Sequence, residues 1–234
     1  MQQPQTCYLC SLAIEADSSR DHIPPKQLYV RSVRLAHSPN LYTLPTHPTC
    51  NKSFQHDEDY FVNSLAPFAA GSYAGNELLT DIGRKFQSGE KVGLVKTVLS
   101  EFEQRPSGLV LPPGLIAKRI EPLRIRRVLW KILRGLYFKE HGAILSPELA
   151  VGIEIFPPDR EPSRLFQEAL ASLDSRGQYP GVFDYKYYRD NTQSDVEYWG
   201  LLFWDRLIIT AIFRPNAEHA PNNSFNPMPL RGTG

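Results

Sequence analysis

Hydrophobic positions recur at helical spacing through the middle of the chain and gather in aromatic and β-branched runs toward its end. The clearest helix is predicted over 122–139, where Leu, Ile and Val return every three to four positions. Another helix is predicted to begin at Pro48, because proline suits a first helical position, and to run to about residue 64. The same spacing predicts helices over 77–87, 91–104 and 162–173.

The last third of the chain predicts an antiparallel sheet. Residues 1–47 hold only short apolar runs broken by Pro and Ser, and they predict loops and short strands. We therefore expect an α+β fold with a small N-terminal part, a helical middle and an α+β C-terminal region. The predicted strands are 152–156, 182–188, 198–203 and 207–213, and residues 204–206 could turn the last two into a hairpin.

Composition narrows the class of protein. The 234 residues include 41% hydrophobic and 22% charged residues, which is typical of a globular protein. A formal net charge of +1 excludes a histone-like polycation but not a nucleic-acid enzyme, which needs positive charge only at the contact. The apolar runs are too short for a membrane span and the N-terminus does not resemble a signal peptide, so we expect a cytoplasmic protein without a membrane partner.

All three cysteines lie within the first 50 residues, in two short pairs. Cys7 and Cys10 form a C-x2-C pair, and His47 and Cys50 form an H-x2-C pair after 36 intervening residues. Two such pairs of nitrogen and sulfur ligands suit tetrahedral zinc, and a metal would hold together a segment with little core of its own. We therefore expect a structural zinc ion. The alternative is a chance C-x2-C with buried free thiols.

Further motifs lie between and after these pairs. The sequence D-H-I-P occupies 21–24, N-L occupies 40–41, and Asn51 directly follows the last cysteine. In this order, and over about residues 5–62, the chain resembles the HNH endonuclease family in its zinc-clipped form. The resemblance implies a small ββα-metal module that hydrolyses phosphodiester bonds with a divalent cation.

The resemblance also implies a role for each residue of the motifs. His22 would be the general base that takes a proton from the attacking water. Asp21 and Asn51 would hold catalytic Mg²⁺ or Mn²⁺ through side-chain oxygens. Asn40 would fix the loop that holds His22, and an ordinary turn asparagine is the alternative. Glu58 returns to the helix face of Asn51 and would support the metal, unless it belongs to a solvated acidic run.

Basic residues suggest where a nucleic acid would bind. One group surrounds the D-H-I-P motif and the last cysteine. A second follows one face of the predicted 122–139 helix, opposite its apolar face, and indicates either a DNA-binding surface or an ordinary solvent face. The first group is Arg20, Lys26, Arg31, Arg34 and Lys52, and the second is Arg124, Arg127, Lys131 and Arg134.

These features predict a metal-dependent endonuclease that cuts or nicks DNA. Residues 1–65 would carry the chemistry, and 66–220 would bind substrate, a protein partner or a second copy of the chain. Residues 221–234, rich in Asn, Pro and Gly, predict a flexible tail. An RNase or toxin-like nuclease on the same fold stays open, because contacts to the 2′-hydroxyl cannot be read from sequence. A non-catalytic zinc module that binds nucleic acid or protein also stays open.

Overall fold

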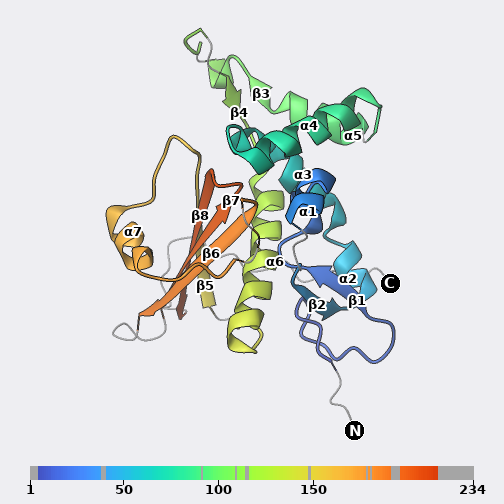
Figure 1. The fold of residues 1–234 in the computed structure, drawn as a ribbon, viewed down its shortest axis with the longest axis vertical. Coiled ribbons are helices and arrows are strands. Elements are labelled where there is room, and N and C mark those ends of the chain that lie inside the picture. Colours follow the sequence, from blue (N-terminus) through green and yellow to red (C-terminus); the bar gives the residue numbers. More distant parts are fainter. Residues whose placement is uncertain are drawn as a thin grey trace.

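The computed structural model describes residues 5–37, 41–90, 92–108, 110–113, 116–146, 149–177, 179, 181–190 and 196–215. It confirms the α+β class, with helices and antiparallel sheets in one chain (Figure 1). Asn40 and the predicted tail over 221–234 lie outside the described residues. None of the helices in the described part of the chain combines the length and the apolar character that a membrane span requires.

The N-terminal part is a strand pair followed by helices. Strand β1 pairs antiparallel with β2, with His22 opposite Thr43. The predicted 48–64 helix is interrupted at residues 53–54, and Pro48 opens its first piece as expected. A helix also forms where loops and short strands were predicted, because Val33 is buried and the exposed residues around it, Arg, Leu and Ala, favour helix. The elements are β1 (Ser19–His22), η1 (Lys26–Leu28), α1 (Arg31–His37), β2 (Thr43–Thr46), α2 (Pro48–Lys52) and α3 (Gln55–Leu65).

The middle of the chain forms an arm at the top of Figure 1. The predicted helix over 91–104 is wrong at its C-terminal end, which lies at Ser100. The next residue, Glu101, is buried and accepts hydrogen bonds from Tyr60, Ser64 and Lys118, so the chain turns there into a short strand. The elements are η2 (Ala66–Ala69), α4 (Tyr73–Gln87), α5 (Val92–Ser100), β3 (Phe102–Glu103), η3 (Pro106–Gly108) and β4 (Ala117–Lys118).

Helix α6 (Pro122–His141) runs through the centre of the molecule (Figure 1). Its apolar face from Val128 to Leu136 is buried, which confirms the predicted helix and its core face, whereas Leu123 in the first turn is exposed. The helix ends at Gly142, whose φ of 64° is the left-handed conformation that glycine adopts without strain. The N-terminal strands and helices lie on one side of α6 and the C-terminal sheet on the other.

The C-terminal sheet has four antiparallel strands in the order β5-β8-β7-β6. Positive φ angles at Trp204 and Asp205 form the predicted turn between the last two strands. In β6 the side chains of Phe183 and Tyr185, two positions apart, are both buried against the core. Helix α7 lies on the face of the sheet away from α6 (Figure 1). The elements are β5 (Leu149–Phe156), α7 (Arg164–Ala171), β6 (Phe183–Asp190), β7 (Val196–Phe203) and β8 (Leu207–Pro215).

One hydrophobic core includes residues from both ends of the described chain. Cys7 and Ile23 belong to the same buried cluster as Trp199 of the C-terminal sheet. The rings of Phe61 in α3 and Phe203 in β7 meet edge to face with centroids 5.8 Å apart. Packing is therefore continuous across the domain boundary predicted near residue 65.

Candidate functional site: a metal centre beside a basic pocket

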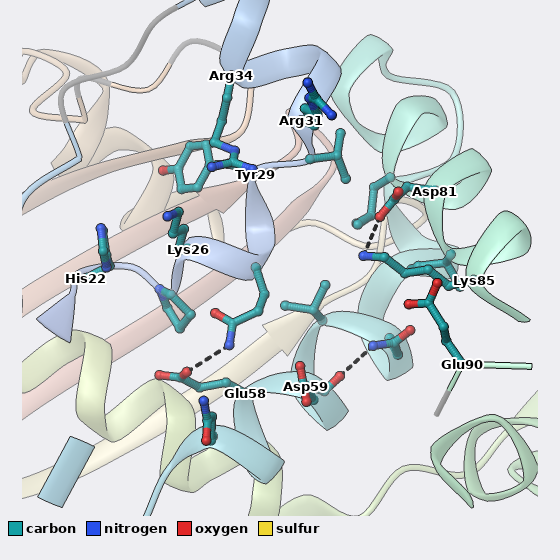
Figure 2. Close-up of a pocket in the computed structure, with 18 of the residues that line it drawn as sticks. His22, Lys26, Tyr29, Arg31, Arg34, Glu58, Asp59, Asp81, Lys85 and Glu90 are labelled. Atoms are coloured by element: carbon teal, nitrogen blue, oxygen red, sulfur yellow. Dashed lines mark hydrogen bonds and ion pairs between the residues drawn. The ribbon is translucent and has the colours of Figure 1, made fainter. Parts of the chain in front are cut away.

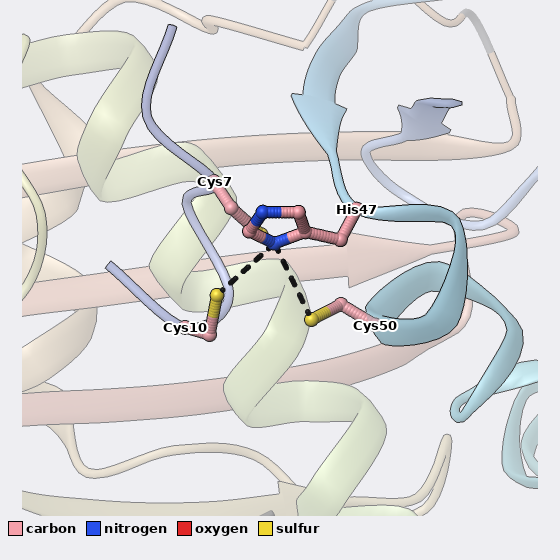
Figure 3. Close-up of side chains that lie close together, drawn as sticks. All are labelled: Cys7, Cys10, His47 and Cys50. Atoms are coloured by element: carbon pink, nitrogen blue, oxygen red, sulfur yellow. Dashed lines mark hydrogen bonds between the residues drawn. The ribbon is translucent and has the colours of Figure 1, made fainter. Parts of the chain in front are cut away.

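Cys7, Cys10, His47 and Cys50 come together at one point (Figure 3). One ligand atom from each residue lies within 4.8 Å of the others. His47 Nδ1 is 3.3 Å from Cys10 Sγ and 3.9 Å from Cys50 Sγ. Three sulfur atoms and one imidazole nitrogen fit a metal ion such as zinc. The four predicted ligands are thus placed as a single candidate metal site.

The local backbone structure places these four side chains close together. The first two cysteines lie in a tight turn, closed by hydrogen bonds from Ser11 N to Cys7 O and from Cys7 N to Leu12 O. His47 precedes α2, and its Nε2 lies 3.1 Å from the Ala13 carbonyl oxygen, which leaves Nδ1 facing the cysteines. Burial and the neighbouring Cys7 and Cys10 thiols raise the pKa of the Cys50 thiol to about 12. A bound cation would remove this repulsion and stabilise the thiolates.

Asp21 is almost fully buried and is hydrogen-bonded to Tyr8, which stands between the first two cysteines. Its Oδ2 accepts a hydrogen bond from the Tyr8 hydroxyl at 2.6 Å, and its Oδ1 accepts one from Lys131 Nζ at 2.7 Å. Lys131 also donates to Glu58, which is buried as well and accepts a second hydrogen bond from Gln27 at 3.2 Å. Glu58 is therefore no part of a solvated acidic run.

The prediction that the basic residues of α6 form an exposed surface is wrong. Lys131 is 0% exposed and Arg134 is 7% exposed. Arg134 donates to the Tyr8 carbonyl oxygen and, at 2.7 Å, to Ser11 Oγ. The N-terminal turn and α3 cover this side of the helix, so its polar face is a second packing face. Arg124 and Arg127 remain partly exposed, but both pair with Asp57.

His22 and Asn51 line one pocket together with Asp21 and Glu58. Figure 2 shows His22 and Glu58 in this pocket. Burial, reinforced by the nearby Lys26 charge, lowers the pKa of His22, which favours the neutral imidazole that a general base requires. Asn51 Nδ2 donates to Ser19 Oγ at 3.3 Å. The predicted catalytic residues within the described part of the chain therefore face one space.

The pocket has a volume of about 720 Å³ and a basic rim. Within the described ranges, no carboxylate pairs with any of the five predicted phosphate-binding residues around it. Arg20 Nε donates only to Thr43 Oγ1, at 2.9 Å. These unpaired cations provide a positive surface next to His22. The five residues are Arg20, Lys26, Arg31, Arg34 and Lys52.

Sequence reasoning missed three residues that shape this site. Tyr8 and Gln27 hold the buried carboxylates, and Tyr29 lies in the pocket wall with its hydroxyl buried. None of the three belongs to a motif, although Tyr8 stands between the first two cysteines. Comparisons of the chain with family models, with curated proteins and with solved structures found no match.

Proposed function

We propose that this protein is a metal-dependent endonuclease of the HNH type that cuts or nicks DNA, built on a ββα-metal module. One observation carries the proposal: His22, Asp21 and Asn51 line a single pocket with a basic rim, directly beside a centre of three cysteines and one histidine that fits zinc. A zinc-stapled scaffold alone would not need an imidazole there. The resemblance in the D-H-I-P and C-N motifs supports the same activity.

Each residue of the pocket has its own role in phosphodiester hydrolysis. His22 takes the proton from a water molecule that attacks phosphorus. Lys26 and Lys52 hold the flanking phosphates. Asp21 and Asn51 would hold Mg²⁺ or Mn²⁺, which supplies stabilisation of charge on the leaving oxygen. Asn51 fits this role because its side-chain oxygen has no partner among the described residues, whereas both oxygens of Asp21 already accept a hydrogen bond and would use their remaining lone pairs.

Supercoiled plasmid incubated with the protein and Mg²⁺ or Mn²⁺ tests the proposal. We expect nicked or linear product, loss of product with EDTA, and loss with His22→Ala. His56→Ala is the matched control, because His56 is an exposed histidine on α3 outside the pocket, and it should keep full activity. Cleavage of an RNA substrate alone would identify an RNase instead.

A second candidate function has its own supporting observation. Lys131 and Tyr8 tie Asp21 into the core, as expected for a structural carboxylate. The chain would then be a zinc-stapled module that binds nucleic acid without cutting it. Gel shifts with DNA and RNA, unchanged by His22→Ala and without cleavage in any metal, would favour this candidate.

A further inference from the structure

Two walls of different chemistry face each other across the pocket that holds His22 (Figure 2). Lys26, Arg31 and Arg34 extend from η1 and α1 on one side. Asp81 and Lys85 extend from α4 on the other. The two walls differ in net charge, in apolar content and in how their polar groups are satisfied.

The η1–α1 wall is cationic and has unused donors. Lys26, Arg31 and Arg34 have no carboxylate partner among the residues that the structure describes. Arg34 Nε and the Tyr29 hydroxyl are buried, and neither has a hydrogen-bond partner among the described residues. Tyr29 as a whole is only 3% exposed. Buried donors without an acceptor are rare in folded proteins. Phosphate oxygens in the pocket would supply the missing negative charge to Lys26, Arg31 and Arg34.

The α4 wall offers little positive charge to a phosphate. Asp81 forms ion pairs with Arg84 at 2.9 Å and with Lys85 at 2.6 Å, so the positive charges of these two side chains are already partly neutralised. Between them the wall is apolar, with partly exposed Ile82 and Phe86 lining the pocket. A flat aromatic ring with an aliphatic neighbour suits a nucleobase, which stacks on such side chains whatever its identity.

We propose that the pocket takes an unpaired nucleotide, with its phosphate on the wall of Lys26 and Arg34 and its base against Ile82 and Phe86. The volume of about 720 Å³ lies within the range of sites that bind molecules of this size. In a continuous duplex every base faces the partner strand, so a base reaches a separate wall only from a single strand or after flipping out. This inference rests on the proposed function and names its substrate class: single strands and unpaired sites.

Binding to the full-length His22→Ala variant tests the pocket without cleavage. Fluorescence anisotropy would compare a short labelled DNA strand, the same strand in a continuous duplex, and that duplex with one bulged nucleotide. We expect the single strand and the bulge to bind at least roughly tenfold more tightly than the continuous duplex. An RNA strand of the same sequence shows whether the pocket distinguishes the two sugars.

Variants of Phe86 test the base-binding wall. Phe86→Ala should weaken single-strand binding roughly 5- to 100-fold, as expected for the loss of one base–aromatic stack. Phe86→Trp keeps an aromatic ring at this position and should bind single strands. That result would show that Phe86→Ala weakens binding by removing the ring and not by disturbing the fold. Tyr73→Ala, which removes an exposed aromatic ring from the start of the same helix outside the pocket, should leave affinity unchanged.

The outcomes separate this inference from the proposed nuclease. Equal affinity for single strand and continuous duplex, or no effect of Phe86→Ala, would overturn the unpaired-nucleotide pocket. A wild-type protein that cuts continuous duplex as fast as single strands would also overturn it, while the nuclease stands. Single-strand binding that depends on Phe86, without cleavage in any metal, would support the pocket and overturn the nuclease.

Discussion

Lys131 is the residue on which the polar interior depends. Its ammonium group is wholly buried and bridges Asp21 of β1 and Glu58 of α3. Burial raises the pKa of Glu58, and the Lys131 charge opposes that rise. A buried ion pair adds little net stability relative to apolar residues, but removing one partner leaves an uncompensated buried charge. Lys131 therefore holds two carboxylates together that would otherwise repel each other.

Replacing Lys131 by methionine should strongly destabilise the protein. Lys131→Met keeps the length of the side chain but leaves both carboxylates unpaired, so we expect the free energy of unfolding to fall by about 3–5 kcal/mol. Urea denaturation measures this loss. Adding Glu58→Gln to Lys131→Met removes one of the unpaired charges and should recover part of it. A loss near zero, or no recovery in the double variant, would contradict this role.

Residue patterns predicted the candidate metal ligands, but they did not predict that two basic residues of α6 are buried. Cys7, Cys10, His47 and Cys50 can be recognised in the sequence because their chemistry depends on residue type and short spacing. Lys131 and Arg134 carry no such signal, because helical periodicity shows that they lie opposite the apolar face but not what covers them. In this protein the covering element comes from more than 100 residues away in sequence, as the pairing of Lys131 with Asp21 shows.

Among the elements, the N-terminal turn would gain most from a metal bound at the candidate site. Within the described part of the chain, the segment before β1 has no helix or strand, only a hydrogen-bonded turn and an isolated bridge between Thr6 and Ala13. Zinc would join this turn to α2, and Arg134 of α6 would then hold the turn through the Tyr8 carbonyl oxygen. With metal bound, the turn would thus be held by the metal and one buried arginine more than by secondary structure of its own.

Metal removal should therefore lower thermal stability. We expect the purified protein to hold about one zinc ion per chain, measured by mass spectrometry of the metal. A strong chelator should remove it and lower the melting temperature by about 2–4 °C for each kcal/mol lost. Acidification should have the same effect, because the ligands bind metal only when deprotonated. Cys10→Ser should melt at the lower temperature with or without chelator; a protein that carries no zinc would contradict the assignment.

Helix α6 packs closely against Ile23, just after the end of β1, and Gly135 permits this. A Cβ atom at Gly135 would lie 2.7 Å from the Cδ1 atom of Ile23, which is the residue directly after His22. We expect Gly135→Ala to destabilise the protein by about 1–3 kcal/mol through overpacking. Gly83→Ala in α4 is the matched control, because nothing lies within 4 Å of its Cβ position. That substitution should stabilise α4 by up to about 1 kcal/mol, since alanine is the better helix former. Similar effects at both positions in chemical denaturation would contradict this packing.

At the scale of the whole molecule, the sequence predicted most of the element types but not how the parts join. The α6 helix and the four strands of the C-terminal sheet are visible in local periodicity, and the structure confirms them. The shift from residues 1–65 to the helical middle suggested two separate domains. Local patterns cannot show that Phe61 meets Phe203, or that Arg134 reaches Tyr8, because these contacts join distant segments.

One continuous core predicts one cooperative unfolding transition. The buried cluster extends from Cys7 through α6 to Trp199, so loss of either end should expose α6 and unfold the rest. We expect zinc release, tryptophan fluorescence and far-UV circular dichroism to change at the same urea concentration. Of the three tryptophans, Trp199 and Trp204 report on the sheet, while zinc release reports on the N-terminal turn. If zinc left at clearly lower urea while the sheet signal held, residues 1–65 would unfold as a separate domain.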